Sequence, residues 1–135
     1  MRKATLLKHE DHMGQVILIV EDEPMNLKLI RDLLQVSGYM TLEAIDGKQG
    51  VKIAKAQKPD LILMDLQLPV VDGFEATRIL KVDERTRDIP IVALTAYAMK
   101  GDEGKVRAAG CNGYIPKPID TRGFLNKITE YLARQ

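Results

Sequence analysis

Three acidic residues, a threonine and a lysine stand at the ends of short apolar stretches of this sequence. Glu21 and Asp22 follow the run VILIV, and Asp65 follows LILM. Thr95 follows IVAL, and Lys117 follows YIP. Carboxylates held close together repel one another and raise at least one carboxyl pKa unless a cation lies between them. Magnesium suits such a place, because it binds a few carboxylate or carbonyl oxygens, keeps several waters and leaves room for a phosphate oxygen.

The lysine and the threonine add groups that an anion would need. Lys117 carries a point charge suited to an anionic ligand, and Thr95 can donate a hydrogen bond to the same anion. Taken alone, each acid is better explained as a solvated loop residue or a helix cap, and the lysine as a surface residue. Their occurrence at the ends of four apolar runs favours phosphoryl chemistry on a carboxylate.

Strands and helices must alternate along the chain to bring these residues together. Continuous apolar runs are typical of parallel strands covered on both faces, and the intervening segments repeat their apolar residues at helical spacing. The pattern predicts an α/β domain, doubly wound, with right-handed crossovers and helices on both faces of a five-stranded parallel sheet. The carboxyl ends of its strands gather at one edge. We expect strands at 16–20, 39–44, 61–64, 91–94 and 114–116, and helices at 24–37, 51–57, 74–81, 98–109 and 124–132.

Composition places the chain among ordinary globular domains. Its 135 residues suit one domain, which we expect at 16–135 after a flexible, polar N-terminal extension at 1–15. A net charge of +1 gives no support to nucleic-acid binding, and no apolar stretch is long enough to span a membrane. The lone Cys111 excludes an intramolecular disulfide and is consistent with a reducing compartment. We therefore expect a cytoplasmic protein with neither nucleic acid nor membrane as a partner.

The segments around these residues resemble the receiver domains of two-component response regulators. The likeness runs from residue 16 to about 132 and includes ILIVEDEPMN, LILMDLQLPVVDGFE, IPIVALTAYA and GYIPKPI, in order and at the expected spacing. The runs ALTAYAMKGDE and GCNGYIPKPI look especially like single-domain regulators and the receivers of hybrid histidine kinases. The resemblance implies a flavodoxin-like sheet with strand order 2-1-3-4-5.

The resemblance also implies a magnesium site and a phospho-acceptor. It makes Asp65 the acceptor and Asp22 a Mg²⁺ ligand, with Glu21 acting on the metal mostly through water. Gln67 would lend its backbone carbonyl to the metal. The family often has Asp where this chain has Glu21, which leaves the metal affinity open.

Further roles carried over from the family concern the phosphoryl group and the response to it. Thr95 and Lys117 would contact the phosphoryl oxygens, Thr95 and Tyr114 would act as the switch pair, and the Lys117–Pro118 bond would be cis. The implied reaction transfers a phosphoryl group from the phosphohistidine of a histidine kinase or a histidine phosphotransfer protein to Asp65. The chain would catalyse only its own phosphorylation and dephosphorylation. It would signal through a face made by the fourth predicted helix, the last strand and the last helix.

Two other classes of protein share parts of this pattern. A phosphatase of the haloacid-dehalogenase type also forms an aspartyl phosphate, but it places a general acid two residues after the nucleophile, where this chain has Gln67. A flavodoxin-like redox module needs a loop rich in Ser and Thr after the first strand. The run Glu21–Asp22–Glu23 would repel the phosphate of a flavin.

Overall fold

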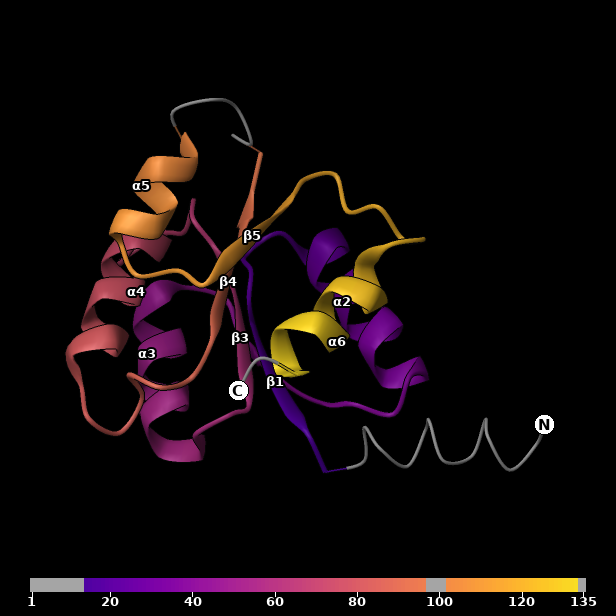
Figure 1. Ribbon diagram of the computed structural model, residues 1–135, viewed down its shortest axis with the longest axis horizontal. Coiled ribbons are helices and arrows are strands. Elements are labelled where there is room, and N and C mark those ends of the chain that lie inside the picture. The colour runs from indigo at the N-terminus through magenta and orange to yellow at the C-terminus, as the bar shows by residue number, and fades with distance from the viewer. Residues whose placement is uncertain (1–13, 97–101, 134–135) are drawn as a thin grey trace.

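The computed structural model describes residues 14–96 and 102–133, which form five strands and five helices (Figure 1). Strands and helices alternate along the described chain, as the sequence predicts. The strands are β1 (Val16–Val20), β2 (Met40–Ala44), β3 (Leu61–Asp65), β4 (Ile91–Thr95) and β5 (Gly113–Pro116). The helices are α2 (Pro24–Val36), α3 (Gly47–Gln57), α4 (Gly73–Val82), α5 (Asp102–Ala108) and α6 (Phe124–Ala133).

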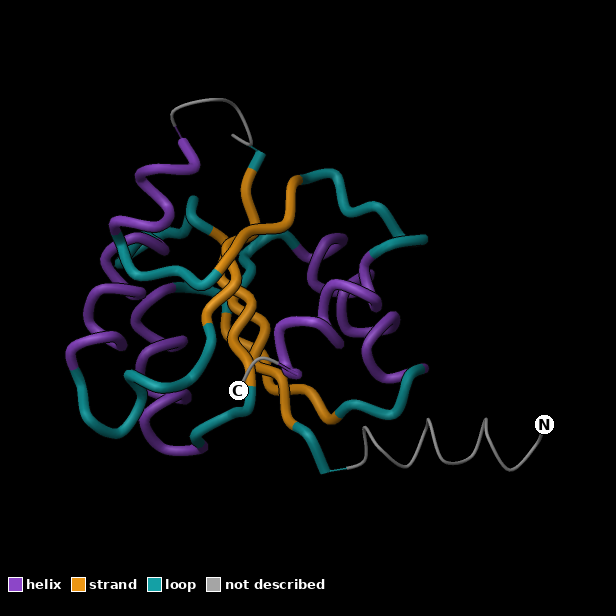
Figure 2. The backbone as a smooth tube through the Cα atoms, viewed as in Figure 1, coloured by secondary structure: helices purple, strands orange, loops and turns teal. Residues whose placement is uncertain are grey.

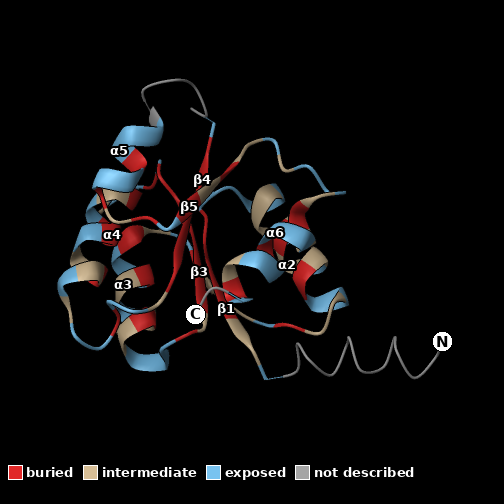
Figure 3. Ribbon diagram, viewed as in Figure 1, coloured by how far each residue is buried: buried red, intermediate tan, exposed pale blue. Residues whose placement is uncertain are grey.

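The strands form one parallel sheet in the order β2-β1-β3-β4-β5, which confirms the expected topology (Figure 2). Helices α3, α4 and α5 cover one face, and α2 and α6 cover the other (Figure 1). Because successive strand residues point to opposite faces, β1 contributes Leu18 to the core under α3 and α4, and Ile17 to the core under α2 and α6. Figure 3 shows the buried residues concentrated in the strands and on the helix faces toward them.

Side-chain caps and positive backbone angles fix where the helices begin and end. Asp46 and Asp72 accept the backbone N–H of Gln49 and Glu75, at 2.7 and 2.9 Å, and so cap α3 and α4. Gly38 follows α2 with φ of 94°, a left-handed conformation that glycine adopts without steric cost. Asp46 and Asp72 lie on loops at the carboxyl edge of the sheet, whereas Gly38 lies at the opposite edge, before β2.

Some boundaries differ from the sequence-based prediction. Helix α3 begins at Gly47 rather than at residue 51, because the cap at Asp46 starts the helix directly and overrides the weak helix propensity of its glycines. The fourth predicted helix is described as Asp102–Ala108, and its predicted start at 98–101 lies outside the described residues. Most of the expected extension, 1–13, also lies outside them. Within the described ranges, no helix combines the length and the apolar character needed to cross a membrane.

Candidate functional site

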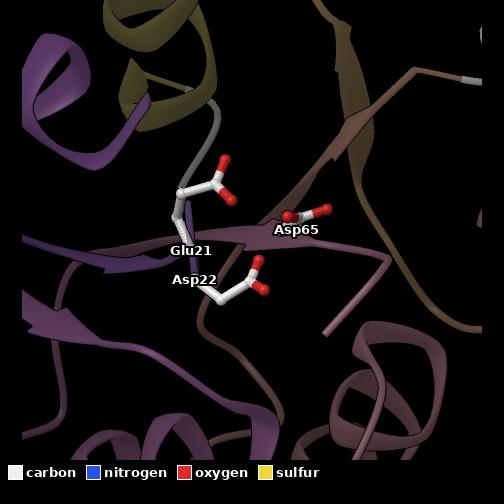
Figure 4. Close-up of side chains that lie close together, drawn as sticks. All are labelled: Glu21, Asp22 and Asp65. Carbon is white, nitrogen blue, oxygen red and sulfur yellow. The ribbon is translucent and has the colours of Figure 1, made fainter. Parts of the chain in front are cut away.

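Three carboxylates meet at the carboxyl edge of the sheet, two just after β1 and one on the last residue of β3 (Figure 4). One oxygen from each of Glu21, Asp22 and Asp65 lies within 4.8 Å of the other two. Glu21 and Asp65 are buried, whereas Asp22 is exposed. The parallel arrangement of the strands thus brings the three acidic residues together, as the sequence predicts.

Lys117 reaches the same cluster from the end of β5. Its Nζ lies 2.8 Å from Oε1 of Glu21 and donates a hydrogen bond of 3.0 Å to Oδ2 of Asp65. The backbone N–H of Lys117 donates to the carbonyl of Thr95 at 2.9 Å, and the Lys117–Pro118 bond is cis, as expected. The ammonium group therefore lies between the two buried carboxylates and partly offsets their repulsion.

Burial of these charges shifts their pKa values. Burial of Glu21, reinforced by the neighbouring Asp65 carboxyl, raises the pKa of Glu21 from 4.5 to about 7, although Lys117 opposes the change. Burial alone would lower the pKa of Lys117, but Glu21 and Asp65 outweigh it and the net shift is upward. The sequence analysis expected a raised carboxyl pKa from repulsion within the cluster; burial is the larger cause here, and the Asp65 carboxyl adds to it.

The other predicted site residues lie on neighbouring strands and loops. Gln67 donates its backbone N–H to Oδ1 of Asp65 at 3.0 Å, so the turn after β3 bends back toward the carboxylate. Thr95 is buried at the end of β4, the strand that pairs with β3. Tyr114 lies on β5, opposite Ala93 of β4, and is half-buried against the core under α3, α4 and α5.

Two glycines support the site, a role that we did not predict from the sequence. A Cβ atom at Gly73 would overlap the carbonyl oxygen of Asp65, and one at Gly47 would overlap the carbonyl oxygen of Val71. Only glycine lets the first residues of α4 and α3 approach the loop after β3 this closely. The sequence signal was the Asp-Gly pair at the start of each helix, which indicates a turn but not what the turn touches.

The donor set fits a hard divalent cation. The cluster consists of carboxylate oxygens, which magnesium prefers, and exposed Asp22 leaves one side open to water. Oε1 of Glu21 is buried and, among the described residues, receives no hydrogen bond of acceptable geometry, although Lys117 lies at ion-pair distance. A buried acceptor of this kind is costly unless a cation or water satisfies it.

Comparison with known proteins connects this geometry to a family. The model of the response regulator receiver domain matches residues 17–129. The polar-differentiation response regulator DivK of Brucella anthropi is 48% identical over 121 residues, which cover 90% of this chain and 98% of that protein.

Solved structures agree with the sequence match. One similar structure is the receiver domain of sensor histidine kinase PA1611 from Pseudomonas aeruginosa PAO1, which holds a magnesium ion in its active-site cleft. It is 41% identical to this chain, with a TM-score of 0.83, and the match covers 89% of this chain and 98% of that one. Another is the receiver domain of Ssk1 from Saccharomyces cerevisiae, solved in complex with the histidine phosphotransfer protein Ypd1. It is 32% identical to this chain, with a TM-score of 0.84, and the match covers 90% of this chain and 91% of that one.

The family match leaves the phosphatase alternative without support, as does the amide side chain of Gln67 at the position that a second acid would need. The fold, the acidic edge and the likeness to DivK agree on one assignment. The chain belongs to the receiver domains of two-component response regulators and acts in phosphorelay signalling.

Proposed function

We propose that Asp65 accepts a phosphoryl group from a phosphohistidine on a partner protein, in a reaction that depends on Mg²⁺. The observation that carries the proposal is the cluster of Glu21, Asp22 and Asp65 within 4.8 Å, with Lys117 at 2.8 and 3.0 Å from two of its oxygens. Asp65 ends a central strand and is the member of the cluster that accepts hydrogen bonds from both Lys117 and Gln67. Its carboxylate is therefore held in a fixed orientation.

The transfer forms one bond and breaks another. An Oδ atom of Asp65 attacks phosphorus while the bond from phosphorus to the imidazole nitrogen of the donor breaks. The bonding electrons return to the imidazole, which can then take a proton from solvent. Positioning and charge stabilisation account for most of the rate in such transfers, because the transition state is loose.

Lys117 and Thr95 would bind the phosphoryl oxygens. Lys117 already lies 3.0 Å from the Asp65 oxygen, so its ammonium needs little movement to pair with a phosphoryl oxygen attached there. Thr95 is buried at the end of the next strand, and its hydroxyl can donate to the same group. A shift of Thr95 would open space for Tyr114, the proposed aromatic switch on β5.

Magnesium would be held by Asp22, Asp65 and the backbone carbonyl of Gln67, with Glu21 acting mostly through water. Bound there, the ion would offset the negative charge of the phosphoryl oxygens and of the carboxylates. The magnesium ion in the cleft of the PA1611 receiver domain supports this assignment. The three groups that would bind the ion directly leave part of the metal shell to water, so we expect weak binding.

A protein with a phosphohistidine is the proposed donor, and the Ypd1–Ssk1 complex supports a histidine phosphotransfer protein or kinase in this role. The chain would catalyse only its own phosphorylation and dephosphorylation. The proposed output surface is the face of α5, β5 and α6. It would contact a downstream protein, because α5 follows β4, the strand that ends in Thr95, and Tyr114 lies on the neighbouring β5.

Phosphotransfer from a panel of histidine kinases tests the proposal. Each kinase is first labelled with ATP and then mixed with the wild-type chain, with and without Mg²⁺. We expect at least one kinase to transfer its label only with Mg²⁺, and Asp22→Asn to lose both metal binding and labelling. Transfer that persists in excess EDTA would show that the metal role is wrong.

A further inference from the structure

The loop that follows β3, the strand that ends in Asp65, contains a strained turn centred on Val70. The N–H of Val71 donates to the carbonyl of Pro69 at 2.8 Å, which closes a three-residue γ-turn, and Val70 has φ of 69°. A β-branched residue at positive φ is a steric outlier, and γ-turns with a positive central φ are rare and strained. Glycine or asparagine would adopt this conformation at lower cost.

The side chain of Val70 contributes little to the stability of the fold that could offset this strain. It is 76% exposed, so it buries little apolar surface within the domain. The turn is nevertheless held firmly in place. Gly47 at the start of α3 abuts the carbonyl of Val71, and the N–H of Gly73 donates to the carbonyl of Leu66 at 3.2 Å. The fold thus fixes an apolar side chain in solvent, five residues after Asp65, in a conformation that favours glycine.

Other features of the carboxyl edge of the sheet indicate what could contact Val70. Two other exposed apolar residues also lie in segments that leave the carboxyl edge of the sheet. They are Met25 after β1 and Ile45 after β2, with exposed fractions of 73% and 53%. Asp65 is only 4% exposed, so a donor protein must approach this edge closely to reach it. A protein interface of standard size covers about 800 Å² on each partner, which extends well beyond three carboxylates to the loops around them.

We propose that Val70 is an apolar contact for the phosphodonor protein and contributes to recognition of that protein. The inference rests on the proposed function, because it takes as its partner the protein whose phosphohistidine reaches Asp65. The strained turn holds Val70 outward beside the acidic edge, and the side chain becomes buried only when the donor docks. Small phosphoryl donors need no such contact.

Two substitutions at this position separate docking from chemistry. Val70→Gly and Val70→Asn remove the apolar side chain and relieve the strain, so both proteins should unfold at urea concentrations no lower than the wild type. Val82→Asn is the matched control. Val82 is also exposed, at 83%, but it ends α4, about 15 Å along that helix from the loop that contains Val70.

The test compares a protein donor with a small one. The donors are the histidine kinase that transfers fastest to the wild type, used below saturation, and acetyl phosphate. We expect both Val70 variants to lose about five- to ten-fold in transfer rate from the kinase, and to keep the wild-type rate with acetyl phosphate. Val82→Asn should match the wild type with both donors.

Three results would count against a docking role. Equal kinase transfer to the wild type and both Val70 variants would overturn the inference and leave the proposed function intact. An equal loss with acetyl phosphate would also overturn it, because the turn would then shape the chemistry instead of docking. If no kinase labelled the wild type, the proposed function itself would fail, and this inference with it.

Discussion

Two adjacent acidic residues occupy opposite environments at the carboxyl edge. Glu21 is fully buried beside Lys117, whereas Asp22 is exposed to solvent. Successive residues of an extended segment point to opposite sides, so the two carboxylates meet different surroundings. Glu21 is therefore held by the fold together with Lys117, and Asp22 remains accessible to a metal and its waters.

The buried Glu21 predicts a specific dependence of stability on pH. Its carboxyl has a pKa of about 7 in the fold, above the ordinary 4.5, so the folded protein binds this proton more tightly than the unfolded chain does. Without metal, the free energy of unfolding should fall as the pH rises from about 4.5 to 7, by a few kcal/mol at most, and then level off. The pKa values of Asp32 and Asp83 are lowered, so these two carboxyls change the stability only at pH values below this window.

Urea unfolding in EDTA across this pH window measures the effect. Glu21→Gln should remove the slope, because an amide does not titrate. Glu130→Gln, at an exposed position of α6, is the matched control and should keep the slope of the wild type. A slope that survived in Glu21→Gln would assign the titration to another group.

At the scale of elements, the first turn of α4 sets the position of the end of β3, the strand that carries Asp65. Gly73 packs on the backbone of Asp65 and Leu66, and the hydroxyl of Thr77 donates to the carbonyl of Gly73 at 2.7 Å. Asp72 caps the same helix. The first turn of α4 therefore supports the backbone from which the Asp65 carboxylate projects.

Gly73→Ala should disturb both the fold and the site. The added Cβ would overlap the carbonyl of Asp65, so we expect a loss of about 1–3 kcal/mol in the free energy of unfolding and slower phosphorylation by acetyl phosphate. Gly104→Ala in α5 is the matched control. Nothing lies within 4 Å of its Cβ position, so this change should stabilise the protein by about 0.5–1 kcal/mol. If Gly73→Ala matched the wild type in both unfolding and phosphorylation, Gly73 would not support the backbone of Asp65.

At the scale of the whole molecule, phosphorylation at one edge should alter one side of the domain. Helix α5 has seven residues, contains Gly104 and packs beside β5, which carries Tyr114. A short helix that contains glycine opens easily, so added charge at Asp65 can shift it. Hydrogen exchange with and without a stable phosphoryl mimic should change most within 95–118. Changes restricted to α2 and α3 would contradict the proposed output face.

The sequence was sufficient for the fold but not for the contacts within the site. Uninterrupted apolar runs located β1, β3 and β4, because these signals are local. The parallel topology then predicted that Asp65 and Lys117 would meet. The pairing of Lys117 with Glu21 and the positive φ of Val70 depend on packing between segments distant in the sequence, which no local pattern encodes.

The identity of the phospho-acceptor is the central claim, and intact-protein mass spectrometry tests it most directly. The wild type, Asp65→Asn and Asp72→Asn are incubated with acetyl phosphate and Mg²⁺. Asp72 is the control because it lies at the same end of the sheet but caps α4. We predict one added phosphoryl group on the wild type and on Asp72→Asn, and none on Asp65→Asn. Stoichiometric labelling of Asp65→Asn would contradict the account.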